Sequence, residues 1–169
     1  MPIGPLGDIG PCQIYWGGAI TSVLEGATFR FTMEYADVKE AEHGVTAVDS
    51  VFKGFGACEF ECPLTRITYA NLATIIPGAS NSGGESGSMS VWSNRVGTTM
   101  YSSAAELIVK RLVNGVVDTE QQYWLHLPKT YPVPQFDIPY DLDTQRGFMV
   151  LFKGFPVTAS GLTWHVGDL

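Results

Sequence analysis

Two glutamates, Glu59 and Glu61, lie two residues apart in a segment where polar and apolar residues alternate. Neighbours at i and i+2 on a β-strand share one face, and retaining glycosidases hold their two catalytic carboxylates about 5 to 5.5 Å apart. The spacing therefore does not exclude acid–base catalysis. Nothing in the adjacent sequence would raise the pKa of one carboxylate above the other, so we interpret the pair as a solvated, acidic sheet face.

The three cysteines, Cys12, Cys58 and Cys62, are also candidates for chemistry. Cys58 and Cys62 lie four residues apart on one predicted strand, which separates them by about 13 Å at ~3.3 Å per residue. That distance is too long for a disulfide or for a shared metal ion. An odd number of cysteines also fits a reducing compartment better than a disulfide framework. We therefore predict three core thiols.

The remaining polar motifs do not match the catalytic patterns that they suggest. His43, His126 and His165 lack the spacing of a zinc or iron site, and we expect structural roles for all three. The serines around Ser86 miss the flanking glycines of a nucleophile elbow, and no glycine-rich segment ends in the Lys-Ser/Thr of a phosphate-binding loop. The sequence predicts no catalytic residue, no metal, no cofactor and no enzymatic activity.

Size and charge restrict the class of protein. At 169 residues the chain is long enough for one well-buried core but short for two. Charged residues make up 16%, below the ~25% typical of soluble domains, which indicates that partners cover part of the surface. The net charge of −7 disfavours binding to nucleic-acid phosphates. The beginning of the chain lacks the basic start and apolar run of a secretory signal, and no segment approaches the ~20 apolar residues of a membrane span, so we expect folding in cytosol.

The elements that must position these residues are mostly strands. Residues 57–64 alternate, with Cys58, Phe60, Cys62 and Leu64 predicted to face the core. Residues 29–35 alternate in the same way. One face carries Phe29, Phe31, Met33 and Tyr35, of which we assign the first three to the core. The other face is polar and carries Arg30, Thr32 and Glu34.

One helix interrupts the strands, with Thr68 as its N-cap and Pro77-Gly78 after its end. Asn114-Gly115 predicts a tight hairpin turn. The prolines between 128 and 139 restrict the next segment to extended or edge backbone. Phe148 to Phe155, apolar on both faces, predicts a central strand.

Four segments show no sustained period. We expect an N-terminal arm at 1–12, a long loop or extended hairpin tip at 36–49, a Gly/Ser-rich loop at 80–97, and a C-terminal tail at 156–169 that needs a partner to be ordered. One pattern occurs twice, as Val51-Phe52-Lys53-Gly54-Phe55 and as Leu151-Phe152-Lys153-Gly154-Phe155. Chance similarity of two glycine-broken strands and relic two-fold symmetry both explain it.

The order of several motifs resembles a known family. They are Tyr15-Trp16-Gly17-Gly18-Ala19, Val45-Thr46-Ala47-Val48-Asp49, Val51-Phe52-Lys53-Gly54, the strand with alternating acids, the run from Leu64 to Ala73 into the helix, and Phe148 to Pro156. Together they cover about half of the chain, and in this order they resemble the tail tube (major tail) proteins of long-tailed bacteriophages. The 80–97 insert and the long segment after Pro156 depart from the family pattern.

The resemblance implies a mainly β subunit, a β-sandwich or barrel-like fold with one flanking helix. Six copies would close into a ring, and rings would stack into a hollow tube that conducts the genome. The implied location is the virion tail, after synthesis in the cytoplasm of the bacterial host. The implied partners are further copies of the chain and the terminator, tape measure and baseplate proteins, with no membrane, no cofactor and no specific binding to the DNA that passes through.

Two sets of residues are assigned on this basis. A tube wall that does not bind DNA calls for exposed acids, so the polar strand faces are candidates for the lumen: Arg30, Thr32, Glu34, Glu59 and Glu61. The loop 36–49 is a candidate for contact with the next ring, through Lys39, Glu40, Glu42, His43 and Asp49. The arm 1–12 and the tail from Thr158 would join that contact, and removing Thr158 to Leu169 is expected to impair polymerisation but leave the fold intact.

Other functions remain open from sequence alone. A tail terminator, a baseplate protein or a capsid-decoration protein of related fold would share these features. Because Trp16, Trp92, Trp124 and Trp164 could stack on sugars, a carbohydrate-binding module is a further alternative, although their spread favours core and interface anchors.

Overall fold

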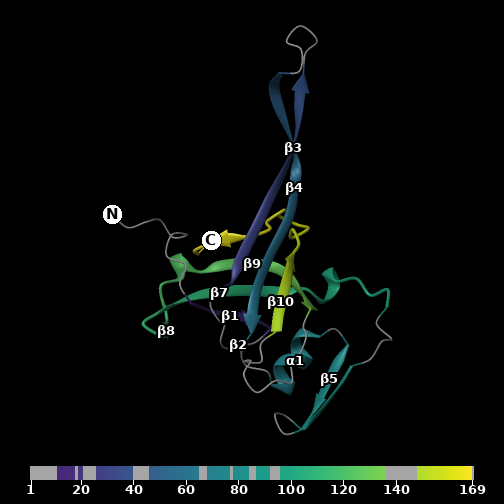
Figure 1. The fold of residues 1–169 in the computed structure, drawn as a ribbon, viewed down its shortest axis with the longest axis vertical. Helices are drawn as coiled ribbons and strands as arrows, with labels where there is room; N and C mark the ends of the chain where they lie inside the picture. The colour runs from purple at the N-terminus through teal and green to yellow at the C-terminus, as the bar shows by residue number, and fades with distance from the viewer. Residues whose placement is uncertain are drawn as a thin grey trace.

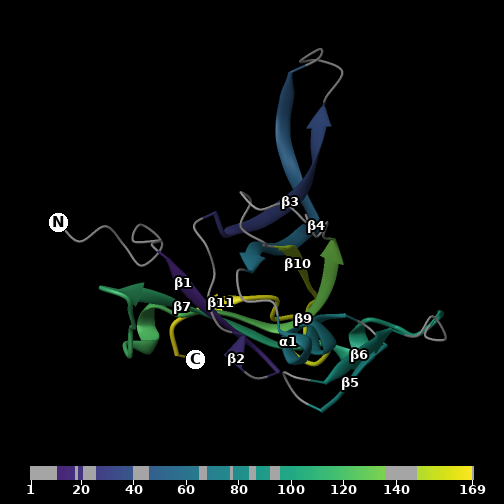
Figure 2. The same cartoon turned by 60° about the horizontal axis from the view of Figure 1, so that its bottom comes forward.

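A single curled sheet forms the body of the protein (Figures 1 and 2). The computed structural model describes residues 11–17, 19–20, 26–39, 46–64, 68–76, 78–83, 87–91, 96–135 and 148–168. The main strands are β1 (Cys12–Trp16), β2 (Ala19–Ile20), β3 (Thr28–Lys39), β4 (Ala47–Leu64), β7 (Ala105–Val113), β9 (Leu125–Gln135) and β10 (Phe148–Gly154). Their order is β2-β1-β7-β9-β10-β4-β3, and the sheet curls into a half-barrel. The predicted mainly β class is confirmed.

Smaller elements complete the described fold. The short strand β8 (Val116–Val117) pairs with β7, and β11 (His165–Val166) pairs with β9. The strands β5 (Ala79–Ser82) and β6 (Ser88–Val91) form a separate antiparallel pair. The expected Gly/Ser-rich loop at 80–97 is therefore partly a hairpin, because polar residues at alternating positions can pair as strands where one side stays exposed.

The core lies on the concave side of the sheet and follows the predicted alternation. Cys58, Phe60, Cys62 and Leu64 are buried along β4. Their neighbours on β10, Val150 and Phe152, are fully buried, because β10 lies between β4 and β9. The predicted central strand is thus confirmed.

The predicted helix forms as α1 (Tyr69–Ile75). The side chain of Thr68 accepts a hydrogen bond from the backbone N–H of Asn71 at 3.2 Å, which satisfies one of the free donors at the first turn. Leu72 and Ile75 of the helix are buried in the core cluster. In the parts of the chain that the structure describes, no helix is long and apolar enough to span a membrane.

The turn between β7 and β8 also follows its sequence signal. Asn114 and Gly115 have φ of 53° and 78°, the left-handed values that a tight hairpin requires. The strand β8 after the turn ends at Val117, and one turn of 3-10 helix at Gln121–Tyr123 precedes β9.

Pro128, Pro132 and Pro134 lie within β9, which confirms the predicted extended backbone for them, and Pro139 lies outside the described residues. β9 changes partners at Thr130, which pairs with Ala105 of β7 and with Gly154 of β10. Beyond Thr130 only β10 pairs with it, so one side of the strand is open. Pro132 and Pro134 lie two residues apart, so the backbone positions that lack an N–H lie on one side of β9, and this can be the open side without loss of a ladder bond.

The segment 36–49 differs from the long loop in the prediction. β3 continues to Lys39 and β4 begins at Ala47, so the two strands form one long hairpin, as in the alternative of an extended hairpin tip. We call the part of this hairpin beyond Thr32 and Gly56 the arm; it comprises residues 33–39 and 46–55. The arm projects from the body along the longest axis of the molecule (Figure 1).

The segment after Pro156 differs from the expected tail, because it folds back onto the body. A turn closes where the N–H of Val157 donates to the carbonyl of Leu162 at 2.8 Å. Trp164 and Val166 then pack against the core cluster. The apolar residues of this segment pack onto the concave face of the sheet, so the segment is ordered by the chain's own core. The predicted N-terminal segment 1–12 lies outside the described residues except for Pro11 and Cys12.

Candidate functional site: the β3–β4 hairpin

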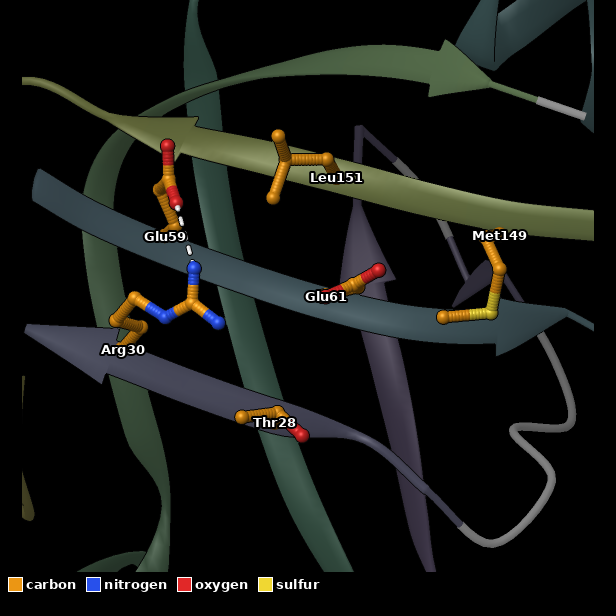
Figure 3. Close-up of a pocket in the computed structure, with 6 residues that line it drawn as sticks. All are labelled: Thr28, Arg30, Glu59, Glu61, Met149 and Leu151. Carbon is orange, nitrogen blue, oxygen red and sulfur yellow. Dashed lines mark ion pairs between the residues drawn. The ribbon is translucent and has the colours of Figure 1, made fainter.

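The convex side of the hairpin base carries the acidic pair. Arg30 lies opposite Glu59 in the β3–β4 register, and Thr28 lies opposite Glu61. Figure 3 shows that these four side chains, with two from β10, line a shallow hollow of about 120 Å³. The other two are Met149 and Leu151. Ligand pockets usually measure about 300 to 1,000 Å³, so the hollow is too small to enclose a substrate of ordinary size.

One ion pair links two of the candidate residues. The Nη1 atom of Arg30 lies 3.9 Å from Oε2 of Glu59, and the Arg30 side chain is 63% exposed. Exposed pairs of this kind contribute about 0 to 1 kcal/mol to stability. Lys153 of β10 lies opposite Glu59 on its other side. The arrangement presents charge to solvent, and the cation of Arg30 lies beside one carboxylate of the acidic pair.

The other two lumen candidates lie farther along β3. At Thr32 the register shifts, and its hydroxyl accepts a hydrogen bond from the N–H of Ala57 at 2.6 Å. A Cβ on Gly56 would lie 2.5 Å from that hydroxyl oxygen, so any other residue there would force the Thr32 side chain to move. Glu34 follows on the arm, opposite Gly54. The structure therefore brings Arg30, Glu59 and Glu61 together and places Thr32 and Glu34 beyond them.

The charge of this face is lower than the acidic residues alone suggest. Arg30 and Lys153 are the cations beside the carboxylates of Glu34, Glu59 and Glu61, so two of the three negative charges are offset. Among the residues that the structure describes, Glu61 has no ion-pair partner. The same holds for Glu34, so among the described residues these two carboxylates are the unpaired charges of the face.

The concave-side face of the arm carries large apolar side chains that face solvent. They are Met33, Tyr35, Phe52 and Phe55, and each is more than half exposed. We call these four residues the apolar arm face. Their exposure corrects the prediction that Met33 belongs to the core, since alternation identifies a shared face but not what covers it.

Two bulges keep the apolar arm face in line with the core. Along the base, Phe31 lies opposite Cys58, and in the arm Met33 lies opposite Phe55 and Tyr35 opposite Phe52. Register shifts between these pairs insert an extra residue into β4 each time. Without them a period of two would turn Phe55 to the polar side. The bulges therefore serve to hold Phe52 and Phe55 on the apolar side.

A continuous row of rings connects the core to the arm. The ring centroid of Trp164 lies 5.4 Å from that of Phe31, Phe31 lies 5.0 Å from Phe55, and Phe55 lies 5.1 Å from Phe52. Aromatic pairs at these separations stabilise one another beyond simple burial. The row begins in the C-terminal segment, at Trp164, and ends at Phe52 on the exposed arm.

The candidate ring-contact residues lie at the far end of the arm. Lys39 is the last residue of β3, opposite Ala47, and Asp49 lies opposite Val38. The carboxylate of Asp49 accepts a hydrogen bond from the N–H of Ser50 at 2.7 Å. Glu40, Glu42 and His43 lie outside the described residues.

The cysteines are buried, as predicted. Burial raises the pKa of the Cys12 and Cys58 thiols to about 11, with a smaller contribution from Glu59 at Cys58. Burial likewise raises the pKa of Cys62. All three are free thiols, and at neutral pH they hold their protons, which makes them poor nucleophiles.

Two of the histidines come together, which the sequence did not indicate. His126 of β9 and His165 of β11 stack face to face with centroids 4.7 Å apart. His43 lies outside the described residues. Only the pairing of two short strand segments distant in sequence creates this contact, so no local pattern could have revealed it.

Comparison with known proteins adds no assignment. The chain matches no protein-family model and no curated protein.

Proposed function

We propose that this protein is the structural subunit of a phage tail tube, with six copies per ring and rings stacked into a conduit for the genome. Its role in this proposal is non-enzymatic, and its place is the virion tail. The observation that carries the proposal is the apolar arm face, a projecting surface that a monomer would expose to water. Monomeric proteins rarely expose contiguous apolar patches of this kind without a partner.

The contrast between two matching motifs supports a missing partner for the arm. Phe152 is fully buried in β10, whereas Phe52 in the same Phe-Lys-Gly-Phe context is 56% exposed. Covering half of a phenylalanine side chain would contribute about 1 kcal/mol. In the proposed tube a neighbouring copy covers the apolar arm face, so that Phe52 gains the environment that Phe152 already has.

The free sheet edge supports ring closure. β3 is the last strand of the sheet order, and its outer edge has no partner strand among the described residues. An edge of twelve residues invites pairing with another chain, and closure of neighbouring sheets removes such edges. In this proposal β3 of one copy pairs with the sheet of the next copy around the ring.

The orientation of the polar face follows from the same arrangement. Sheets that join edge to edge into a ring keep one face toward the centre. Of the described residues around Arg30, Glu59 and Glu61 on the convex side of the hairpin base, none is buried. That face would line the lumen. DNA would slide past a surface of low and slightly negative charge, with neither binding nor strong repulsion.

The test is electron microscopy of the purified protein together with its mass in solution. Long uniform tubes are expected. Single rings would favour a terminator or baseplate component, and monomers at all concentrations would contradict the tube and favour a decoration protein. Specific binding on a glycan array with no assembly would instead support the carbohydrate-binding alternative.

A further inference from the structure

The C-terminal strand β11 is attached to the sheet by a very short ladder. It pairs with the first half of β9 through two residue pairs, His165 with His126 and Val166 with Leu125 (Figure 2). The first pair places two imidazole rings directly on top of one another, with 4.7 Å between centroids and 8° between planes. The stack is therefore one of the side-chain contacts that hold β11 against β9.

Charged groups from each neighbouring element surround the stack. From β7, Oε1 of Glu106 lies 3.0 Å from Nδ1 of His126, and Lys110 lies 3.6 Å above the ring of Trp124. Trp124 in turn stacks on His126 at 6.2 Å. Asp168, three residues after His165, adds a negative charge on the C-terminal segment itself.

Each ring also has one buried nitrogen whose surroundings fit only the neutral form of the imidazole. Nε2 of His126 and Nδ1 of His165 are buried and have no hydrogen-bond partner. With the proton of neutral His126 on Nδ1, facing Glu106, its Nε2 is a lone pair; with the proton of neutral His165 on Nε2, its Nδ1 is a lone pair. Protonation would turn either lone pair into a buried N–H without an acceptor, which is costly.

A second proton on the stack adds repulsion. Two imidazolium ions face to face at 4.7 Å would repel each other in a partly buried site, with the cation of Lys110 nearby. The carboxylate of Glu106 lies against His126, whereas the buried Nδ1 of His165 has no hydrogen-bond partner among the described residues, so His165 is the ring that must stay neutral. In agreement, burial lowers the pKa of His165 from its usual 6.5, and His126 lowers it further, while Glu106 and Asp168 act in the opposite direction.

The segment next to the stack covers the base of the ring row. Trp164, adjacent to His165, contacts Phe29 and Phe31 with centroids 5.3 and 5.4 Å apart. Val166 packs against the core on the same side. Detachment of β11 would therefore uncover Phe29 and Phe31, and the exposed apolar row would extend from the arm into the mouth of the half-barrel.

We propose that the stacked pair His126–His165 is an acid-released latch, which holds the C-terminal segment over Phe29 and Phe31 at neutral pH and lets it detach when protonated. A histidine that is harder to protonate in the closed state takes up its proton on opening. Closure is therefore complete above pH ~6.5 and weakens as the pH falls toward the lowered pKa of His165. Because opening takes up one proton, the equilibrium constant for closure falls by at most about tenfold per pH unit.

Hydrogen exchange on the intact protein tests the latch. Protection of peptides from 160–168 is measured between pH 7.5 and 5, corrected for the intrinsic pH dependence of exchange, and compared with peptides from 58–64. In the wild type, protection of 160–168 should fall by up to about tenfold per pH unit below ~6.5, while 58–64 stays protected. In His165→Phe, which keeps a stacked ring but cannot be protonated, this dependence should disappear.

Several results would overturn the proposal. Constant protection of 160–168 down to pH 5 in the wild type would do so without any variant. Loss of protection in 58–64 in step with 160–168 would show global acid unfolding instead of a latch. The same pH profile in wild type and His165→Phe would assign the effect to other groups, since Glu106 and Asp168 are unchanged in the variant.

Discussion

Phe31 and Phe55 lie 5.0 Å apart between ring centroids although a β-bulge separates their positions along the hairpin. Phe31 belongs to the half-buried base, and Phe55 belongs to the exposed arm. The contact shows that the arm is an extension of the core surface rather than a loose loop. The proposal that another chain covers the arm rests on this extension of the apolar face into solvent, and the predictions below test that proposal.

Truncation of the two matched phenylalanines of the repeated motif should lower the stability of the monomer by very different amounts. Phe152→Ala removes a fully buried ring and should lower the free energy of unfolding by about 3 to 5 kcal/mol. Phe52→Ala removes a ring that is more than half exposed and should change the stability of the monomer by less than about 1 kcal/mol. Urea unfolding of dilute protein measures both, and equal losses at the two sites would contradict the assigned burial.

Assembly should depend on the arm in a way that monomer stability does not. The double variant Phe52→Ser/Phe55→Ser should weaken each contact between copies by about 2 kcal/mol, or roughly thirtyfold in association constant. Val116→Ser, at another highly exposed apolar position, is the matched control. Sedimentation and electron microscopy would show shorter or absent tubes for the arm variant alone. If the control impairs assembly equally, the apolar arm face has no special role.

The sequence indicates the fold where a simple period persists and fails where the period shifts. Alternation from Cys58 to Leu64 identifies the buried face correctly because this stretch pairs without irregularity. Before Gly56 two bulges change the phase, so alternation in β4 no longer says which side Phe55 and Phe52 face. The core assignment of Met33 fails for a different reason. Period shows which residues share a face, but only the three-dimensional arrangement shows that nothing covers them.

The candidate site shows the same limit. Arg30 and Glu59 were both placed on the polar face from sequence, and their pairing follows from the hairpin register. The cation of Lys153 beside them comes from β10, distant in sequence, so the acidic pair could not be recognised as partly neutralised. The stacked histidines depend on a ladder of two residue pairs that no propensity or pattern predicts.

Charge on the polar face should affect DNA passage and leave assembly unchanged. Glu61→Lys changes an ion-pair-free carboxylate at a partly exposed position, so the stability change should stay under about 1 kcal/mol. Tubes should form normally, but particles that carry the variant should release DNA more slowly at low salt, since screening weakens the new attraction as salt rises. Glu120→Lys makes the same charge change on an exposed residue away from this face. Normal DNA release from intact Glu61→Lys tubes would sink the lumen assignment.

Loss of the C-terminal segment should destabilise the monomer, contrary to the expectation from sequence that the fold would stay intact. Trp164 covers Phe29 and Phe31, and Trp164→Ala should therefore cost about 2 kcal/mol of unfolding free energy for a partly buried ring. Ser160→Ala, an exposed position in the same segment, should cost less than about 0.5 kcal/mol. Thermal unfolding separates the two outcomes. Equal unfolding temperatures for wild type and Trp164→Ala would mean that the C-terminal segment does not stabilise the monomer.

The buried thiols predict a specific dependence on alkaline pH. The pKa of Cys12 and Cys58 is raised by burial to about 11, from an ordinary 9.0. Such groups stabilise the folded state fully below the unfolded pKa, and this contribution is lost as the pH rises toward 11. At pH 8 the folded protein should react with iodoacetamide only as fast as it opens, because about 0.1% of each thiol is ionised. In urea all three cysteines should react readily. Rapid labelling of Cys12 or Cys58 in folded protein at pH 8 would show that these thiols are accessible, and the packing of β1 or of β4 against the core would then be wrong.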